Sequence, residues 1–255
     1  MVMDFNLRTL LIVCPMVFLS GFVDSVAGGG GLISIPAYVF AGLPMINAYG
    51  TNKFSAALGT CVSSFKYFKS GNIHLPTGAA SAAGALIGAW AGSQLAMVME
   101  DRVLRYCLMV ILPVAGGFIL FNRKFGENED FHAKVKALYL KAFVIGLALG
   151  AYDGFFGPGT GTFLMILFCV VLGLPLVTSS GNAKVTNLAS NIASAIAYLL
   201  GGKVIFWLGI PAACCTIAGN YLGAHLAIKN GSKFIKPLIM AVIVLLMLKI
   251  VTELF

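Results

Sequence analysis

Two apolar segments share one combination of residues, an aspartate followed four residues later by a break rich in glycine. Such a break leaves unpaired backbone N–H groups at the start of the next helix, where the helix dipole favours an anion. The repetition predicts an anion-binding role for both breaks, with a close helix-packing site as the alternative. The residues assigned to the site are Gly28, Gly29 and Gly30 in the first break and Gly157, Gly159 and Thr160 in the second.

Downstream of each break, a lysine opens a row of residues spaced alternately three and four apart, which places the row on one helical face. A lysine at the centre of a membrane helix costs about 2.5–3.5 kcal/mol. Two matching lysines therefore favour a substrate pathway over the alternative, in which each stem reaches the membrane surface. The rows are Lys53, Ala56, Thr60, Ser63 and Tyr67, and Lys184, Asn187, Asn191, Ser194 and Tyr198, with Asn52 and Asn182 beside them. We assign both lysines and the four asparagines to the substrate site.

The two aspartates, Asp24 and Asp153, admit three roles. A carboxylate in an apolar segment needs a cationic partner or a proton. Each aspartate could therefore couple transport to protons, pair with Lys53 or Lys184, or brace the glycine turn. The residues alone leave these roles open.

The composition predicts a chain embedded in lipid. Of its 255 residues, 59% are hydrophobic and 10% are charged, and the mean hydropathy is +0.95. Soluble domains carry roughly 25% charged residues, so a soluble enzyme, a nucleic-acid-binding module and a disordered chain are excluded. Basic loops on the cytoplasmic side of a multi-pass protein explain the net charge of +8. We expect a multi-pass protein of the plasma or inner membrane, with the bilayer as partner and no nucleic acid.

Because a span needs about 20 apolar residues, the chain is interpreted as an all-α polytopic membrane protein of eight hydrophobic segments. A polar loop at 122–136 separates a first transmembrane repeat, 1–121, from a second, 137–255. The segments lie near 8–41, 46–68, 76–98, 103–121, 137–172, 177–200, 204–227 and 234–252.

The two repeats are related by an internal duplication. With a shift of 131 residues, 14 of the 55 positions from 42 to 96 are identical, among them both lysines and the Gly-Leu-Pro turns at 42–44 and 173–175. Duplicated halves are typical of transporters. The two long segments opening the halves are broken by glycine, and we expect each to form a re-entrant hairpin, which makes the repeats inverted. Full crossing, with parallel repeats, is the alternative, and the distribution of basic residues does not choose between them.

Glycines repeat every fourth residue at Gly84, Gly88 and Gly92, and Gly219 and Gly223 have the same spacing in the second half. This spacing lets membrane helices pack closely, within one chain or in a homodimer. The six cysteines and three histidines show no metal-binding spacing, so neither a metal nor a cofactor is predicted.

The motifs Gly21-Phe22-Val23-Asp24-Ser25-Val26-Ala27-Gly28-Gly29-Gly30-Gly31-Leu32, Ile35-Pro36 and Gly50-Thr51-Asn52-Lys53 resemble the signature of the TauE/SafE sulfite-exporter family. The second half, with Tyr152-Asp153-Gly154-Phe155-Phe156-Gly157-Pro158-Gly159-Thr160-Gly161 and Ala183-Lys184, is similar to its YfcA-like branch. The resemblance covers nearly the whole chain. It implies a multi-pass bacterial transporter that moves sulfite, sulfonates or related small organic anions, generally out of the cell.

The residues and the resemblance together predict a secondary transporter that exports a small anion by alternating access. The breaks and both lysines are expected to form a positive, partly dry pocket near the interface of the repeats. The alternatives are a cation carrier or cation-coupled carrier that uses Asp24 and Asp153, and a non-transporting accessory subunit of a membrane complex. We do not expect an enzyme, because no nucleophile, base or metal cluster is evident.

Overall fold

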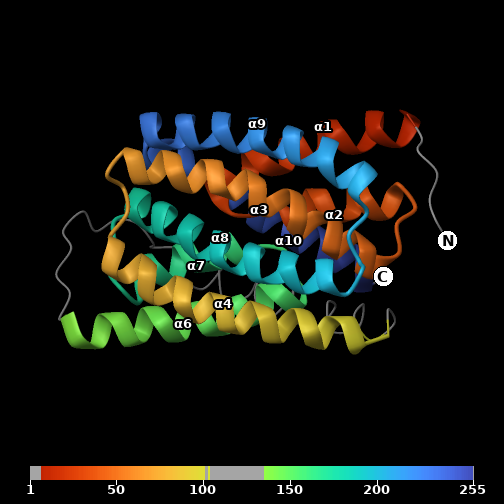
Figure 1. Cartoon of the computed structure of the whole chain (residues 1–255). Helices are drawn as coiled ribbons and strands as arrows, with labels where there is room; N and C mark the ends of the chain where they lie inside the picture. The colour runs from red at the N-terminus through yellow and green to blue at the C-terminus, as the bar shows by residue number, and fades with distance from the viewer. Residues whose placement is uncertain (1–6, 101–102, 104–134, 255) are drawn as a thin grey trace.

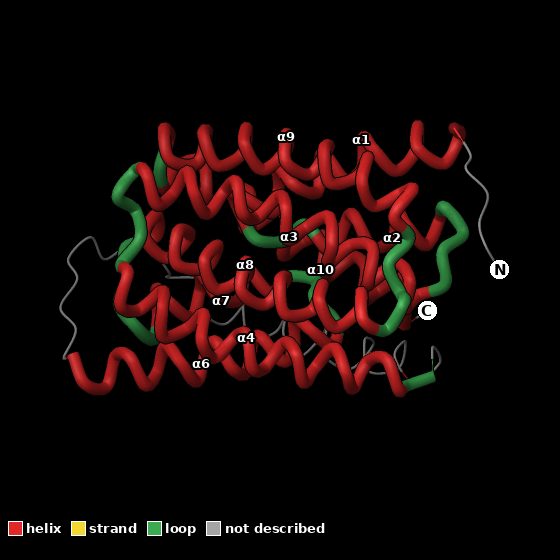
Figure 2. The backbone as a smooth tube through the Cα atoms, in the orientation of Figure 1, coloured by secondary structure: helices red, strands yellow, loops and turns green. Residues whose placement is uncertain are grey.

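The computed structural model describes residues 7–100, 103 and 135–254. These residues form nine α-helices and no strand (Figures 1 and 2). The predicted segment at 103–121, which contains Cys107, lies outside the described residues except for Val103, as does the loop to residue 134 with His132. The helices are α1 (Leu7–Ala27), α2 (Gly31–Phe40), α3 (Met45–Lys69), α4 (Leu75–Val98), α6 (Val135–Phe155), α7 (Thr160–Val170), α8 (Leu176–Leu200), α9 (Phe206–Asn230) and α10 (Ser232–Leu254).

The helix boundaries coincide with the glycine breaks and the Gly-Leu-Pro turns of the sequence. Both long segments divide at their glycine breaks, into α1 with α2 and α6 with α7. The repeated Gly-Leu-Pro turn introduces α3 and α8 in the same way: Gly42 and Gly173 take positive φ angles of 92° and 68°. Pro44 and Pro175 then take extended N-cap conformations. Because α3 and α8 are 25 residues each, each is about 37 Å long.

Three described helices are long and apolar enough to cross a membrane: Thr9–Ala27, Leu75–Val98 and Ala137–Phe155. The chain is therefore a multi-pass membrane protein. Helices α3 and α8 have the length of a span, but their buried faces carry polar side chains that lower their hydropathy. The number of segments that cross the membrane stays a prediction.

The long helices lie side by side, and matching helices of the two halves run in opposite directions (Figure 1). Helices α3 and α8 are antiparallel, since Gly50 lies against Tyr198 while Lys53 contacts Asn191. Helix α4 is parallel to α6, and α1 and α3 are parallel to α9. In the described part of the chain, α2 folds back along α1, and α7 along α6, from opposite ends of the bundle.

The glycine ridges pack helices of this chain against each other. A Cβ added at Gly88 would lie 2.1 Å from the carbonyl oxygen of Leu147, and one at Gly219 would lie 2.1 Å from that of Phe18. The ridges therefore join α4 to α6 and α9 to α1 at backbone contact distance. A homodimer stays a prediction, and the ridges that suggested it are already buried within the chain.

Candidate functional site

The two glycine breaks meet in the middle of the bundle. Gly28 follows α1 with φ +79°, and a Cβ there would lie 2.2 Å from the backbone of Gly161. Thr162 Oγ1 donates a hydrogen bond of 2.6 Å to the carbonyl oxygen of Ala27. Glycine at position 28 is thus required both by the left-handed backbone and by the close approach of the second half.

Two buried ion pairs cross between the halves at this meeting point. Lys53 Nζ of α3 lies 2.6 Å from Asp153 Oδ2 of α6, and Lys184 Nζ of α8 lies 2.9 Å from Asp24 Oδ2 of α1. Each lysine therefore binds the aspartate of the opposite half. Of the three roles left open for the aspartates, the structure shows the pairing with lysine.

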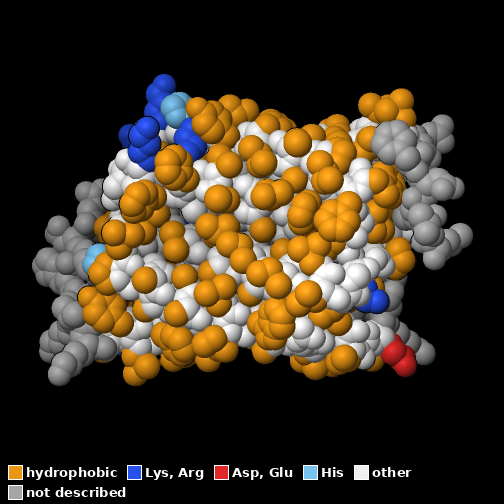
Figure 3. Space-filling view, in the orientation of Figure 1, with side chains coloured by type: hydrophobic (Ala, Val, Ile, Leu, Met, Phe, Trp, Pro, Cys, Tyr) orange, Lys and Arg blue, Asp and Glu red, His pale blue; other side chains and the backbone are white. Residues whose placement is uncertain are grey.

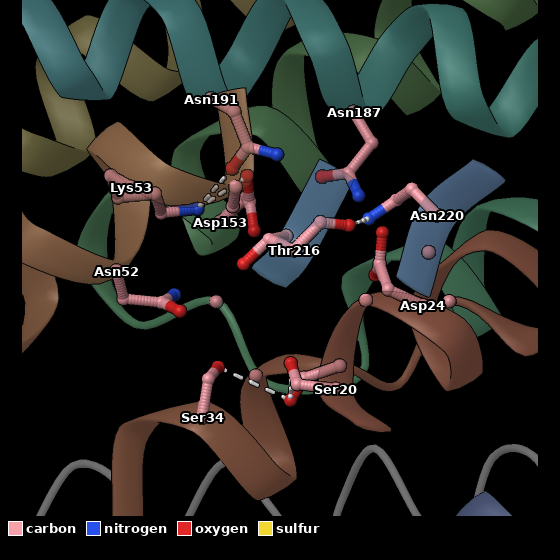
Figure 4. A pocket seen from close by; sticks show the side chains of 17 residues that line it. Ser20, Asp24, Ser34, Asn52, Lys53, Asp153, Asn187, Asn191, Thr216 and Asn220 are labelled. Carbon is pink, nitrogen blue, oxygen red and sulfur yellow. Dashed lines mark hydrogen bonds and ion pairs between the residues drawn. The ribbon is translucent and has the colours of Figure 1, made fainter. Parts of the chain in front are cut away.

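Helix α8 completes the surroundings of the first ion pair (Figure 4). Lys53 also donates to Asn191 Oδ1 at 3.1 Å, and Asn191 donates to Thr60 Oγ1 at 3.2 Å. Ser190 donates to Asp153 Oδ2 at 2.6 Å. The polar rows of α3 and α8 thus meet at Asn191, next to Asp153, and charge-assisted hydrogen bonds hold both charges.

In the second ion pair the lysine is more deeply enclosed than Lys53, whereas Asp24 is 16% exposed, against 4% for Asp153. The side chain of Lys184 is 0% exposed, against 6% for Lys53, and it donates both to the carboxylate and to the backbone carbonyl of Asp24. Two tyrosines of the rows brace the breaks symmetrically: Tyr67 donates to the carbonyl of Ser25, and Tyr198 donates to that of Gly154. Each brace therefore ties a row to the broken helix of its own half.

A small cavity of about 30 Å³ lies beside the first pair, which is space for a few water molecules. The amides of Asn52, Asn187 and Asn191 face it together with Lys53 (Figure 4). The predicted residues that line the cavity are Asp24, Gly28, Gly30, Asn52, Lys53, Asp153, Gly157, Asn187 and Asn191.

Five predicted residues have other surroundings. A Cβ on Gly29 would meet Val242 of α10, and Thr160 Oγ1 donates to the carbonyl of Gly157 at 2.8 Å. Gly159 is the left-handed N-cap of α7, Asn182 lies near Gly78 of α4, and Lys184 is enclosed behind Asp24. None of these five residues lines the cavity.

Helix α9 contributes two polar residues that the sequence prediction missed. Thr216 and Asn220, four apart on one face of a helix, line the cavity with Ser20 and Ser34. The side-chain oxygen of Asn220 is buried and has no hydrogen-bond partner in the described part of the chain. An amide four residues after a threonine inside an apolar segment was the signal that could have found them.

The expected positive pocket is neutral in the structure. Each lysine charge is matched by a carboxylate within 3 Å, because an unpaired buried charge is far more costly than a paired one. What the cavity offers a ligand is therefore hydrogen-bonding groups plus charges that become available if an ion pair opens. Among the described residues, no group of three or more histidine, cysteine, aspartate or glutamate side chains could hold a metal ion.

The chain is similar to known membrane proteins over most of its length. The family model described as "Sulfite exporter TauE/SafE" matches residues 13–250. The probable membrane transporter protein YfcA of Escherichia coli strain K12 is 34% identical over 224 residues, covering 88% of this chain and 82% of that protein. A probable membrane transporter protein of Haemophilus influenzae is 32% identical, covering 98% of each chain. No solved structure matches the chain.

The buried pair Lys53–Asp153 yields a prediction for stability. Lys53→Met and Asp153→Asn each leave one charge unpaired, so each should lower the free energy of unfolding by about 3–5 kcal/mol. The double variant removes both charges and should recover most of that loss. Thermal unfolding of the four purified proteins in detergent measures the coupling, and additive losses in the double variant would contradict a direct pair.

Proposed function

The chain belongs to the sulfite exporter TauE/SafE family, and from this membership we propose that it is a secondary transporter of a small anion. The proposed substrates are sulfite, a sulfonate or a related organic anion, exported by alternating access. The observation that carries the proposal is the crossed pair of buried lysines, Lys53 and Lys184, each held by an aspartate of the opposite half.

In this proposal, each aspartate is a resident anion that the substrate replaces. An oxyanion that reaches Lys53 can take the place of the Asp153 carboxylate, which takes up a proton as it is released, so neither buried group is left as an unpaired charge. Because leaving a buried charge unpaired costs about 3–5 kcal/mol, an empty protein resists opening and a loaded one does not. The amides of Asn52, Asn187 and Asn191, which face the same cavity, would supply hydrogen bonds to the remaining oxygens.

The asymmetry between the two pairs supports alternating access. A cavity of about 30 Å³ is small for an oxyanion of several heavy atoms, and we propose that the halves separate to admit the substrate. Lys53 borders this cavity, whereas Lys184 is enclosed. In inverted repeats, exchanging the conformations of the two halves exchanges such environments. We propose that Lys184 and Asn182 face the cavity in the opposite state.

We further propose that α1–α2 and α6–α7 are re-entrant hairpins, within repeats 1–121 and 137–255 of eight hydrophobic segments joined by loop 122–136. The opposite directions of α3 and α8 support inversion. Basic residues gather where α3 and α9 end, which makes that end cytoplasmic by the positive-inside rule. Those in described helices at this end are Lys66, Lys69, Lys136, Lys141, Lys229, Lys233 and Lys236, whereas Arg8 of α1, Lys203 and Lys249 of α10 lie at the other end.

A cation carrier would require Asp24 and Asp153 to be available as ligands. Both carboxylates are instead bound by lysine ammonium groups within 3 Å, which repel a second cation at the same oxygens. This observation favours the anion. Proton coupling through an aspartate released by substrate fits the same exchange.

Anion binding should stabilise the purified protein against heat. An anion at 100 times its dissociation constant raises the free energy of unfolding by about 2.7 kcal/mol, so a thermal-shift screen of sulfite, sulfate, sulfonates, phosphate and short carboxylates should find a ligand. The charge-neutral doubles Lys53→Met/Asp153→Asn and Lys184→Met/Asp24→Asn should lose the shift, because neither leaves a buried charge unpaired. Lys203→Met, in a loop at one end of the bundle, is the matched control and should keep it.

Two results would contradict the anion site. A shift that survives in both neutral doubles would place the ligand elsewhere. The absence of any shift in the wild type would favour an accessory subunit instead of a transporter.

Cysteine labelling tests the re-entrant arrangement. In a cysteine-free background, single cysteines at Ala41 and Gly202 should react with an impermeant maleimide from one membrane face, and those at Asn72 and Asn230 from the other. Segments that cross fully would instead put Ala41 with Asn230 and Asn72 with Gly202. Labelling of intact cells and of inverted vesicles distinguishes the two patterns.

A further inference from the structure

We propose that the groove between the last turns of α3 and α9 binds the headgroup of an anionic phospholipid from the surrounding leaflet. The groove encloses about 650 Å³, far more than the central cavity, and lies at one end of the bundle. Figure 3 shows basic side chains and a histidine gathered at this end beside a broad hydrophobic surface. The residues that carry the proposal are Phe65, Lys66, Lys69, Tyr221 and His225.

Among the described residues, those around the groove form a basic rim without an acidic residue to balance it. Lys66 and Lys69 occupy the last turn of α3, and Lys229 occupies the last turn of α9. Neither the described ends of these helices nor the adjoining ends of α4, α6 and α10 contain aspartate or glutamate. Two lysines thus line the groove and a third, Lys229, ends the adjoining helix, and no acidic residue in these described helix ends neutralises them.

The helix dipoles account for only part of this charge. Lysines near helix C-termini complement the dipole, which is equivalent to roughly half a negative charge per helix. Two helix ends thus balance about one of the three lysines. Among the described residues of these helix ends, an excess of about two positive charges remains, which suits a phosphate-bearing headgroup.

The body of the groove suits the acyl chains. Phe65 is 64% exposed and Tyr221 is 53% exposed, so apolar rings face outward below the lysines. Lys66 Nζ lies 3.4 Å from the centre of the Tyr221 ring, which holds the ammonium at the mouth of the groove by a cation–π contact. An ammonium above an apolar groove at a helix end is the arrangement by which basic pockets between membrane helices bind anionic headgroups.

The test uses the full chain in neutral detergent, with phosphatidylglycerol, phosphatidylcholine or inorganic phosphate added as the probe. Phosphatidylglycerol should raise the midpoint of thermal unfolding of the wild type, and the other two probes should not. Because each basic residue near an anionic headgroup contributes about fivefold in affinity, Lys66→Gln/Lys69→Gln should need an about 30-fold higher phosphatidylglycerol concentration for the same shift. Lys233→Gln/Lys236→Gln removes the same charge from α10 and is the matched control.

Each other outcome overturns the proposal. An equal loss in the α10 control would mean attraction to overall charge, without a site. Equal stabilisation by phosphatidylcholine would mean that the headgroup charge is not recognised, and an equal effect of inorganic phosphate would indicate a soluble anion site. The lipid site does not depend on the transport function, so the two proposals fail separately.

Discussion

A charge buried among membrane helices must be neutralised, and this constraint organises the centre of the protein. Each lysine, Lys53 and Lys184, binds an aspartate contributed by the opposite half. Neither half alone can satisfy its own charges, so the ion pairs join the halves more specifically than apolar packing would. Removing one member is costly because it leaves the other charge unpaired. In the proposed exchange the substrate anion keeps the lysine paired, and the displaced aspartate takes up a proton. The ion pairs can therefore hold the two halves together, and in the proposed function an anionic substrate lets the halves separate.

The backbone around the pairs serves this requirement. Gly28 and Gly161 let the two breaks touch, which brings Asp24 and Asp153 within reach of lysines from the other half. Tyr67 and Tyr198 anchor each row to its own broken helix. The glycine ridges of α4 and α9 hold the long helices at backbone contact. Close packing at the periphery and ion-paired contacts at the centre thus coexist in one bundle.

Spacing along the sequence predicted the helices, the breaks and the polar rows well, because those features depend on local periodicity. It could not predict which aspartate meets which lysine, because that depends on the opposite directions of α3 and α8. The same limitation explains Gly29 and Asn182, which share a segment with the site but face other helices. Thr216 and Asn220 were missed because alanines occupy the matching positions, 85 and 89, in the first half, so the duplication did not mark them.

The most direct test of the central claim is the affinity for sulfite of protein in which the resident carboxylate is removed. Isothermal titration of sulfite into Asp153→Asn and Asp24→Asn proteins in lipid nanodiscs should show tighter binding than the wild type, because the internal competitor for the lysine is gone. Weaker binding, or none, in both variants would contradict exchange and would make the aspartates part of a cation or proton site.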